Sequence, residues 1–426
     1  MLKLILLPNN FPPKRGGIAT WMYSICRYMD ADEINCFVES TEDCSNVDRQ
    51  NSFNIIRVGN PGAIHFQSLI KHLNQVIRIL WMNRNLMNRD LSLSSVLSWF
   101  FCLMRMNFVQ LKYSVLHINS ILTQINHLKD HIVLCGTVLP PGLTAYFLSI
   151  FFQIPYAVIA HGDEIIRWQK HNNYRHIAKI VFQNSSLIIA NSHYTQRLLN
   201  TIDISNTKIR IVHPGVDTKA FFPRKINVGK SNPYRFRNSK IILSVGSLIP
   251  RKGHDAVIKA LEHVLKNEPH AHFVIAGDGP YRADLKSMVA NLGLEQHVTF
   301  TGEVEDHQLQ DLLNMCSVFI MPSRHTRDSV EGFGIVFIEA NACAKPVIGG
   351  NSGGIEDAII NGHTGFVVNP CNYMEIAEKI ILLLQNQKLA KKMGMNGMNR
   401  AIKYFDWPIV IKQLRQVLID GLIQNH

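Results

Sequence analysis

Short apolar, β-branched runs alternate with longer amphipathic stretches along most of the chain, and this alternation limits the possible folds more than any other feature. Runs typical of strands in the first half are KLILLP, SVLHIN, HIVLCG, YAVIAHG, LIIANS and IRIVHPG. Those in the second half are KIILSVGSL, AHFVIAGDG, VTFTG, VFIMPS, KPVIGG and TGFVVNP. Strands that alternate with helices form parallel sheets whose faces the helices cover. The sequence therefore predicts an α/β fold.

The chain is long enough for more than one domain. It has 426 residues, and single hydrophobic cores seldom grow beyond about 250–300 residues. The segment 221–240, FFPRKINVGKSNPYRFRNSK, is basic, aperiodic and contains proline, as expected of a linker. We therefore predict two doubly wound, Rossmann-like domains facing across a cleft.

Cysteine usage and hydropathy bear on location. The eight cysteines form no C-x-x-C pair, so neither a zinc site nor a disulfide framework is indicated, and a reducing cytosol is expected. The apolar run at the start is too short for a signal peptide and predicts a strand. Residues 139–160 predict a buried helix followed by the strand YAVIA. Residues 91–108 fit either a membrane-interface segment or a core helix.

Positive charge is concentrated in the first half. The net charge is +12, and residues 1–222 hold 21 Lys and Arg against 13 Asp and Glu. This bias suits an anionic partner such as a phosphate-bearing substrate or an anionic lipid surface, or else a solvated surface without a role. We find no basic, aromatic-interleaved motif that would indicate nucleic acid.

Ligands of doubly wound sheets bind beyond the carboxyl ends of the strands, so residues there are the first candidates. Gly16 and Gly17 precede a helix expected near Ile18, where backbone amides can approach a phosphate. His161 follows the strand YAVIA. Arg251 and Lys252 follow IILSV in a loop suited to a diphosphate. Each feature also has a plainer explanation: a tight turn, a structural histidine or two exposed basic side chains.

The segment SVEGFGIVFIEA carries two carboxylates eight positions apart. A helix is expected to begin near Phe333 or Gly334, with Glu331 in the loop before it and Glu339 inside it. The free amides of the helix start, at Gly334, Ile335 and Val336, suit a diphosphate. Carboxylates accept hydrogen bonds from sugar hydroxyls, so the pattern suggests a nucleotide sugar. The plainer alternative is one acid favoured by the helix dipole and one surface acid.

Ten segments occur in the order seen in glycosyltransferase family 4: FPPKRGGIATW, AHGDE, NSHYT, HPGVD, VGSLIPRKG, AGDGP, FTGEV, MPSR, EGFGIVFIEA and PVIGGNSGGIEDAI. The sequence most resembles its phosphatidylinositol-mannosyltransferase-like and polysaccharide-biosynthesis members. The resemblance spans nearly the whole chain except residues 60–115. It implies the GT-B fold and a metal-independent hexosyl transfer from a UDP- or GDP-sugar with retained anomeric configuration.

The resemblance also assigns residues. It implies a first domain of residues 1–222 plus 405–426, with the last helix crossing back onto it, and a nucleotide-sugar-binding domain of residues 238–404. Catalytic roles fall on His161 beside the sugar, on Glu331 at its hydroxyls and on Lys252 at the diphosphate, with no metal site and no cofactor beyond the donor. The implied donor-binding residues are Gly17, Ser247, Arg251, Lys252, Gly302, Val304, Glu331, Phe333, Gly334, Ile335 and Glu339.

One position departs from the family pattern. Family members commonly have Gly-Arg-Leu where this chain has Gly246-Ser247-Leu248, so Arg251, Arg324 or Arg327 would have to supply the missing cation. The implied acceptor is a glycan or a lipid-linked molecule of cell-surface polysaccharide, lipopolysaccharide or glycolipid synthesis. The expected location is the cytoplasm or, peripherally, the cytosolic face of the inner membrane.

Two alternatives stay open. A GT-B nucleotide-sugar epimerase would act without an acceptor, and a non-catalytic nucleotide-sugar-binding scaffold subunit would not act at all. A dehydrogenase is the least favoured class, because no G-x-G-x-x-G with a following acid opens either half.

Overall fold

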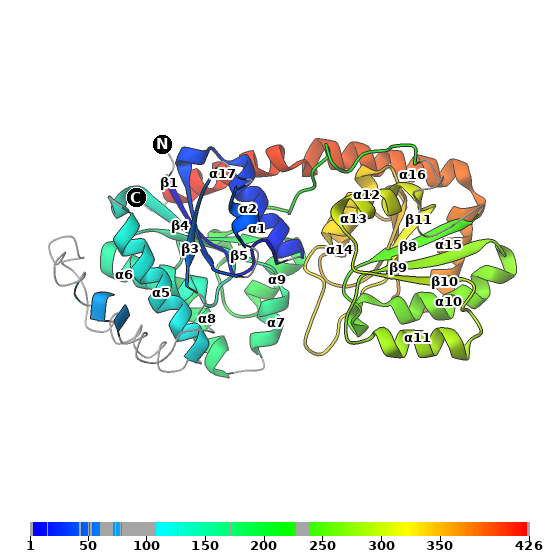
Figure 1. The fold of residues 1–426 in the computed structure, drawn as a ribbon, viewed down its shortest axis with the longest axis horizontal. Helices are drawn as coiled ribbons and strands as arrows, with labels where there is room; N and C mark the ends of the chain where they lie inside the picture. Colours follow the sequence, from blue (N-terminus) through cyan, green and yellow to red (C-terminus); the bar gives the residue numbers. More distant parts are fainter. Residues whose placement is uncertain are drawn as a thin grey trace. The chain divides into compact units, whose positions relative to one another are not determined.

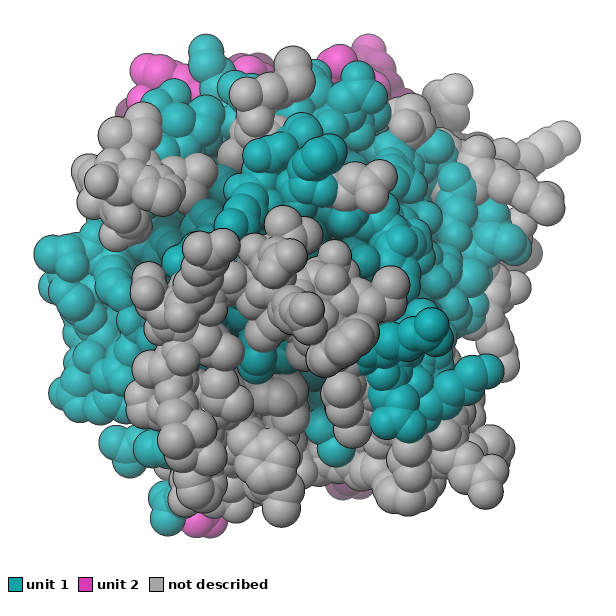
Figure 2. Space-filling model, turned by 90° about the vertical axis from the view of Figure 1, so that its left-hand side faces the viewer, with its two compact units in different colours: residues 1–191, 195–212, 411–426 teal, residues 192–194, 213–410 magenta. Residues whose placement is uncertain are grey.

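The computed structural model describes residues 3–14, 16–41, 44–49, 51, 53–59, 71–72, 74–76, 78, 108–125, 127–169, 172–226 and 239–423. The chain forms two compact units, traced in Figure 1 and coloured separately in Figure 2. Unit 1 comprises residues 1–191, 195–212 and 411–426, and unit 2 comprises residues 192–194 and 213–410.

Unit 1 contains a seven-stranded parallel sheet in the order β3-β2-β1-β4-β5-β6-β7. Its strands are β1 (Lys3–Leu7), β2 (Ile34–Glu39), β3 (Asn54–Val58), β4 (His131–Cys135), β5 (Tyr156–Ala160), β6 (Leu187–Ala190) and β7 (Ile209–Ile211). Its helices are α1 (Gly17–Tyr28), α2 (Cys44–Arg49), α5 (Phe108–Gln124), α6 (Pro141–Phe152), α7 (Asp163–Gln169), α8 (Asn172–Asn184) and most of α9 (His193–Asn200). Helix α6 packs against β4, β5, α5 and α8.

Unit 2 contains a six-stranded parallel sheet in the order β10-β9-β8-β11-β12-β13. Its strands are β8 (Lys240–Val245), β9 (Ala271–Ala276), β10 (Val298–Gly302), β11 (Val318–Met321), β12 (Val347–Gly350) and β13 (Gly365–Val368). Its helices are α10 (His254–Asn267), α11 (Arg282–Asn291), α12 (Asp306–Met315), α13 (Ile335–Ala342), α14 (Ile355–Ala358), α15 (Tyr373–Gln385) and α16 (Gln387–Arg400).

The strands of unit 2 are buried on both faces because helices cover each side. Along β9, Phe273 and Ile275 pack into a cluster with α10, α11 and α15, whereas Val274 and Ala276 pack into a second cluster with α12 and α13. Successive side chains of a strand point to opposite faces, so the two clusters lie on opposite sides of the sheet. Figure 1 shows α10 and α11 on one side of β8 and β9 and α12 and α13 on the other. This double winding confirms the predicted α/β fold.

Most of the predicted strands are present, but the strand predicted for SVLHIN is wrong. These residues lie within helix α5, in which Tyr113, Val115, Leu116, Ile118 and Ile121 are buried. Burial on nearly every side of a helix removes the polar stripe that would have revealed its period.

Two strands were missed, and two segments were predicted correctly. The missed strands are β2 and β3, which lie at one end of the first sheet. The segment 139–160 forms α6 and β5 as predicted. The run KLILLP forms β1, also as predicted.

Apart from residues 192–194, which group with unit 2, the chain passes between the units at residues 212/213 and within α17 (Trp407–Ile423) at residues 410/411. The predicted divisions lie near residues 222 and 405. The segment 91–107 and most of the predicted linker, residues 227–238, lie outside the described residues. Within the described part of the chain, no helix has both the length and the apolar character needed to cross a membrane.

Arg415 on α17 forms an ion pair with Glu33 in unit 1. Its guanidinium donates hydrogen bonds to both Glu33 carboxylate oxygens, at 2.6 and 3.2 Å. The Glu33 side chain is 1% exposed, whereas that of Arg415 is 43% exposed. Removing the arginine would leave Glu33 as a buried, unpaired carboxylate, and a buried charge without a partner destabilises the folded state.

We therefore expect Arg415→Ala to lower the free energy of unfolding, since loss of the guanidinium leaves the buried Glu33 carboxylate without its charged partner. Chemical denaturation measures this change. Lys412→Ala, an exposed position on the same helix, is the matched control and should leave stability nearly unchanged. Equal effects of both substitutions would contradict the assigned role of the ion pair.

Candidate active site

The strand order of unit 2 reverses between β8 and β11, which are direct neighbours in the sheet. Ligands of doubly wound sheets bind beyond the carboxyl ends of the strands at such a reversal. The loop after β8 carries Arg251 and Lys252, and the loop after β11 carries Glu331. The topology thus brings predicted site residues about 80 positions apart to one edge of the sheet.

Glu331 is the centre of this group. Its Oε2 accepts hydrogen bonds from Arg251 Nη1 and Lys252 Nζ, both at 2.6 Å. The three side chains are only 12–15% exposed. Ser323, which follows β11, donates from its hydroxyl to the same oxygen at 3.4 Å. The structure therefore joins the three predicted residues and adds Ser323, which sequence reasoning missed although it stands at a strand end.

The protonation state of Glu331 follows from these contacts. Burial by itself would raise the pKa of the carboxyl, but Lys252 and Arg251 outweigh burial and lower the pKa to about 2. Glu331 is therefore ionised throughout the neutral range, and one anion holds two cations at the edge of the sheet.

Backbone contacts fix the loop that carries the two cations. The Arg324 amide donates to the Arg251 carbonyl at 2.8 Å and thereby joins the loops after β8 and β11. Gly253 has φ 76°, and a Cβ there would lie 2.2 Å from the Pro322 carbonyl oxygen, so only glycine fits. The loop is also tied to the turn after β9, because the Leu248 amide donates to the Asp278 carbonyl at 2.9 Å.

The start of helix α13 lies directly after Glu331. The helix begins at Ile335, close to the predicted start, and its N-cap Gly334 has φ 89°. A Cβ at Gly334 would lie 2.6 Å from the Phe337 ring, so the turn requires glycine. Amides in the first turn of a helix have no intrahelical acceptor, and they can therefore bind an anion. Phe333, in contrast, is buried and stacks against His213.

Glu339 lies inside α13 and differs from Glu331 in its electrostatics. Burial, together with Asp306, raises its pKa to about 7. The carboxyl therefore changes protonation near neutral pH. In its protonated form it can both donate and accept a hydrogen bond.

The remaining predicted donor residues of unit 2 lie in turns. Ser247 is exposed in the loop after β8. Gly302 ends β10 with φ 74° and accepts a hydrogen bond from the Gly277 amide at 2.8 Å, and Val304 packs partly buried nearby. Of the arginines considered in place of the one missing at position 247, Arg251 contacts Glu331, whereas Arg324 pairs with Asp255 at 2.6 Å.

Gly17 and His161 belong to unit 1. Gly17 is the first residue of α1 and is exposed, one position before the predicted start. His161 is buried, and its Nε2 donates to the Gly136 carbonyl at 2.7 Å. Burial lowers its pKa to about 4, so the ring is neutral near pH 7 and Nδ1 is left as the acceptor nitrogen. A positively charged His161 is therefore not expected at neutral pH.

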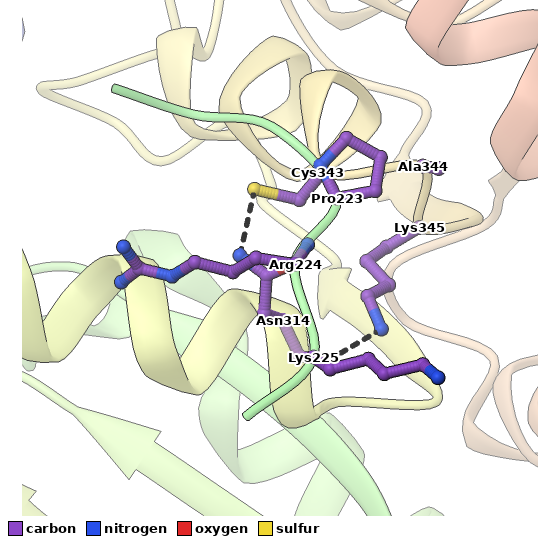
Figure 3. A pocket seen from close by; sticks show the side chains of 7 residues that line it. All are labelled: Pro223, Arg224, Lys225, Asn314, Cys343, Ala344 and Lys345. Atoms are coloured by element: carbon purple, nitrogen blue, oxygen red, sulfur yellow. Dashed lines mark hydrogen bonds between the residues drawn. The ribbon is translucent and has the colours of Figure 1, made fainter. Parts of the chain in front are cut away.

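A cavity of about 320 Å³ on unit 2 involves none of the predicted donor residues. Its lining, drawn in Figure 3, is Pro223, Arg224, Lys225, Asn314, Cys343, Ala344 and Lys345. The Lys345 ammonium donates to the Asn314 and Cys316 carbonyls at 2.7 and 2.9 Å. The Asn314 amide contacts Cys343 Sγ at 3.6 Å. This cavity is thus distinct from the group around Glu331.

Comparisons with known proteins agree with the fold. The family model "Glycosyl transferases group 1" matches residues 230–400, and "Glycosyltransferase Family 4" matches residues 100–220. Two solved structures share the fold. HepE from Anabaena in complex with UDP-glucose matches with a TM-score of 0.75 and 18% identity, over 99% of this chain and 100% of its own. Sucrose-phosphate synthase from Thermosynechococcus elongatus matches with a TM-score of 0.75 and 19% identity, over 100% of both chains. The fold is therefore GT-B, as predicted, and the class is that of the glycosyltransferases.

Sequence relatives give the family. The GDP-mannose-dependent α-(1-6)-phosphatidylinositol monomannoside mannosyltransferase of Mycobacterium tuberculosis is 31% identical over 61% of this chain and 68% of its own length. The enzyme of the same name from Mycolicibacterium smegmatis is 31% identical over 58% of this chain and 65% of its own length. The GDP-mannose-dependent monoacylated α-(1-6)-phosphatidylinositol monomannoside mannosyltransferase of Corynebacterium glutamicum is 25% identical over 98% of this chain and 97% of its own length. The chain belongs to glycosyltransferase family 4.

The raised pKa of Glu339 leads to a pH-dependent stability. The folded carboxyl, with a pKa of about 7, binds more protons than the unfolded one at about 4.5, so stability should fall as pH rises through this window. We expect wild type to lose stability relative to Glu339→Gln between pH 4.5 and 7, as measured by urea denaturation. A constant difference between the two proteins across that range would contradict the assigned environment of Glu339.

Proposed function

We propose that the protein is a retaining, metal-independent hexosyltransferase that uses a UDP- or GDP-sugar. The observation that carries this proposal is the pair of cations, Arg251 and Lys252, held on Glu331 at the reversal of strand order next to the start of α13. Side-chain cations and helix amides together provide positive charge for a diphosphate, and such preorganised charge stabilises a leaving group as its bond breaks.

We assign Glu331 to the sugar hydroxyls and not to nucleophilic attack. Its carboxylate is bound by two cations and has a pKa of about 2, so it is a weak nucleophile. We therefore favour a front-face route over a double displacement. In this route the bond between the anomeric carbon and the diphosphate oxygen breaks, the acceptor oxygen bonds on the same face, and the departing phosphate takes the acceptor proton.

We propose a glycan or lipid-linked acceptor in cell-surface polysaccharide or glycolipid synthesis. The relatives from M. tuberculosis and C. glutamicum carry names that specify GDP-mannose and a phosphatidylinositol mannoside, which makes GDP-mannose the first donor to test. The roles given to Gly17, Gly302, Val304 and His161 stay predictions.

Nucleotide binding tests the proposal directly. With UDP, GDP, ADP and NAD⁺ each in excess, we expect UDP or GDP alone to raise the melting temperature, since a ligand at a hundredfold excess over Kd stabilises by about 2.7 kcal/mol. Lys252→Ala should lower the affinity for whichever nucleotide binds by roughly tenfold to a hundredfold, because a charge-assisted contact contributes about 1.5–3 kcal/mol. Its turnover with the matching sugar should fall about a hundredfold.

The matched control is Lys259→Ala, an exposed lysine on α10, which should bind and turn over normally. Near-normal turnover of Lys252→Ala would contradict the proposed role of this cation. No shift with any of the four nucleotides would contradict the proposal. A shift with UDP or GDP without turnover of any matching sugar would favour the nucleotide-sugar-binding scaffold, whereas an epimerised sugar in an assay without acceptor would favour the epimerase.

A peripheral membrane location is a second part of the proposal, motivated by the positive charge of residues 1–222. We expect purified protein to sediment with vesicles containing anionic lipid at low salt and to be released at high salt, since screening weakens such attraction. Vesicles of neutral phosphatidylcholine are the control. Protein that stays in the supernatant with the anionic vesicles at low salt would rule this part out.

A further inference from the structure

Unit 2 brings together two histidines and an aspartate that are not among the predicted donor residues, although His213 stacks against one of those, Phe333. His193 is the first residue of α9, His213 follows β7, and Asp357 lies on α14. One potential ligand atom from each lies within 4.8 Å of the others. All three belong to unit 2, since residues 192–194 pack with that unit. Three distant segments thus place nitrogen and carboxylate ligands around one point.

The Asp357 carboxylate is held in a fixed orientation. Its Oδ2 accepts from the His193 backbone amide at 2.7 Å, while Oδ1 lies 2.6 Å from His193 Nδ1. Arg400 donates to the main-chain carbonyls of Asp357 and Ala358, both at 2.6 Å, and so orients the segment that carries the carboxylate. Neighbouring hydrogen bonds of this kind orient metal ligands and support their affinity.

The His213 ring is also held in place. It stacks against Phe333 at 5.3 Å between ring centroids and meets Phe405 edge-on at 6.0 Å. His193, in contrast, has a side chain that is 58% exposed, so it can adjust and leaves a path from solvent. The cluster therefore has two positioned ligands and one adaptable ligand.

We propose that His193, His213 and Asp357 form a binding site for a divalent transition metal, represented by Zn²⁺. Two imidazoles and a carboxylate form a suitable set for zinc, with water as the fourth ligand. Ligand atoms about 2.0–2.2 Å from zinc lie roughly 3.3 Å apart in a tetrahedron. That spacing falls between the 2.6 Å separation of His193 Nδ1 from Asp357 Oδ1 and the 4.8 Å limit of the cluster.

Binding requires a small rearrangement and the loss of a proton. The proton shared between His193 Nδ1 and Asp357 Oδ1 leaves to solvent when both atoms bind the metal. The metal then links the start of α9 and the segment after β7 to α14, which stabilises unit 2. The proposed transfer reaction uses none of these three side chains, and zinc binding is measured without that reaction, so failure of one proposal can be told from failure of the other.

Zinc binding can be measured without an activity assay. Tag-free full-length protein, stripped with a chelator and dialysed, is titrated with Zn²⁺ against a chromophoric zinc chelator. We expect the affinity of wild type to exceed that of His193→Ala and of Asp357→Asn by about tenfold or more, because each loses one ligand. Zn²⁺ should also raise the melting temperature of wild type and not that of His193→Ala.

The control variant is His270→Ala, which removes an exposed histidine elsewhere on unit 2 and should bind zinc as wild type does. Excess Mg²⁺ should not compete, since it prefers oxygen ligands. Because the His193 side chain is exposed, His193→Ala should fold as wild type does. The comparison of wild type with His193→Ala therefore tests the proposal even if Asp357→Asn is unstable. Equal zinc affinity of wild type and His193→Ala, or displacement of zinc by Mg²⁺, would overturn the proposal.

Discussion

The ion pairs of Glu331 with Arg251 and Lys252 organise the functional edge of unit 2. A carboxylate buried this far is tolerated only when charged partners compensate it. The two cations come from the loop after β8 and the anion from the loop after β11, so the pairing fixes both loops at the reversal of strand order. The glycine at 253 and the Arg324 amide reinforce the same junction. The start of α13 is thereby held beside the cations.

Much of this arrangement follows from sequence because it depends on local patterns. Apolar β-branched runs identified most strands, and the glycines of SVEGFGIVFIEA placed the start of α13 close to where it lies. The strand-end rule singled out Arg251 and Lys252, and the pair of carboxylates in SVEGFGIVFIEA singled out Glu331. Their direct contact could not be predicted, because it depends on β8 and β11 being neighbours, which local sequence does not specify.

Other features escaped prediction for physical reasons. Helix α5 is buried on most sides, so SVLHIN has the composition of a strand although it forms part of a helix. Strands β2 and β3 contain polar residues such as Asn35 and Asn54, which weaken the apolar pattern. The cluster of His193, His213 and Asp357 is assembled from three separate segments, and no spacing between them signals a shared site.

The charges around Glu331 explain how a serine can stand at position 247. Arg324 is neutralised by Asp255, whereas Arg251 and Lys252 share a single anion, so this group keeps a net charge of about +1 near neutral pH. The start of α13 adds roughly half a positive charge. A diphosphate bound as we propose would therefore meet positive charge without an arginine at 247. In that proposed complex the diphosphate would also compete with Glu331 for the two cations, so the carboxylate that joins the two loops would limit how tightly a phosphate group binds there.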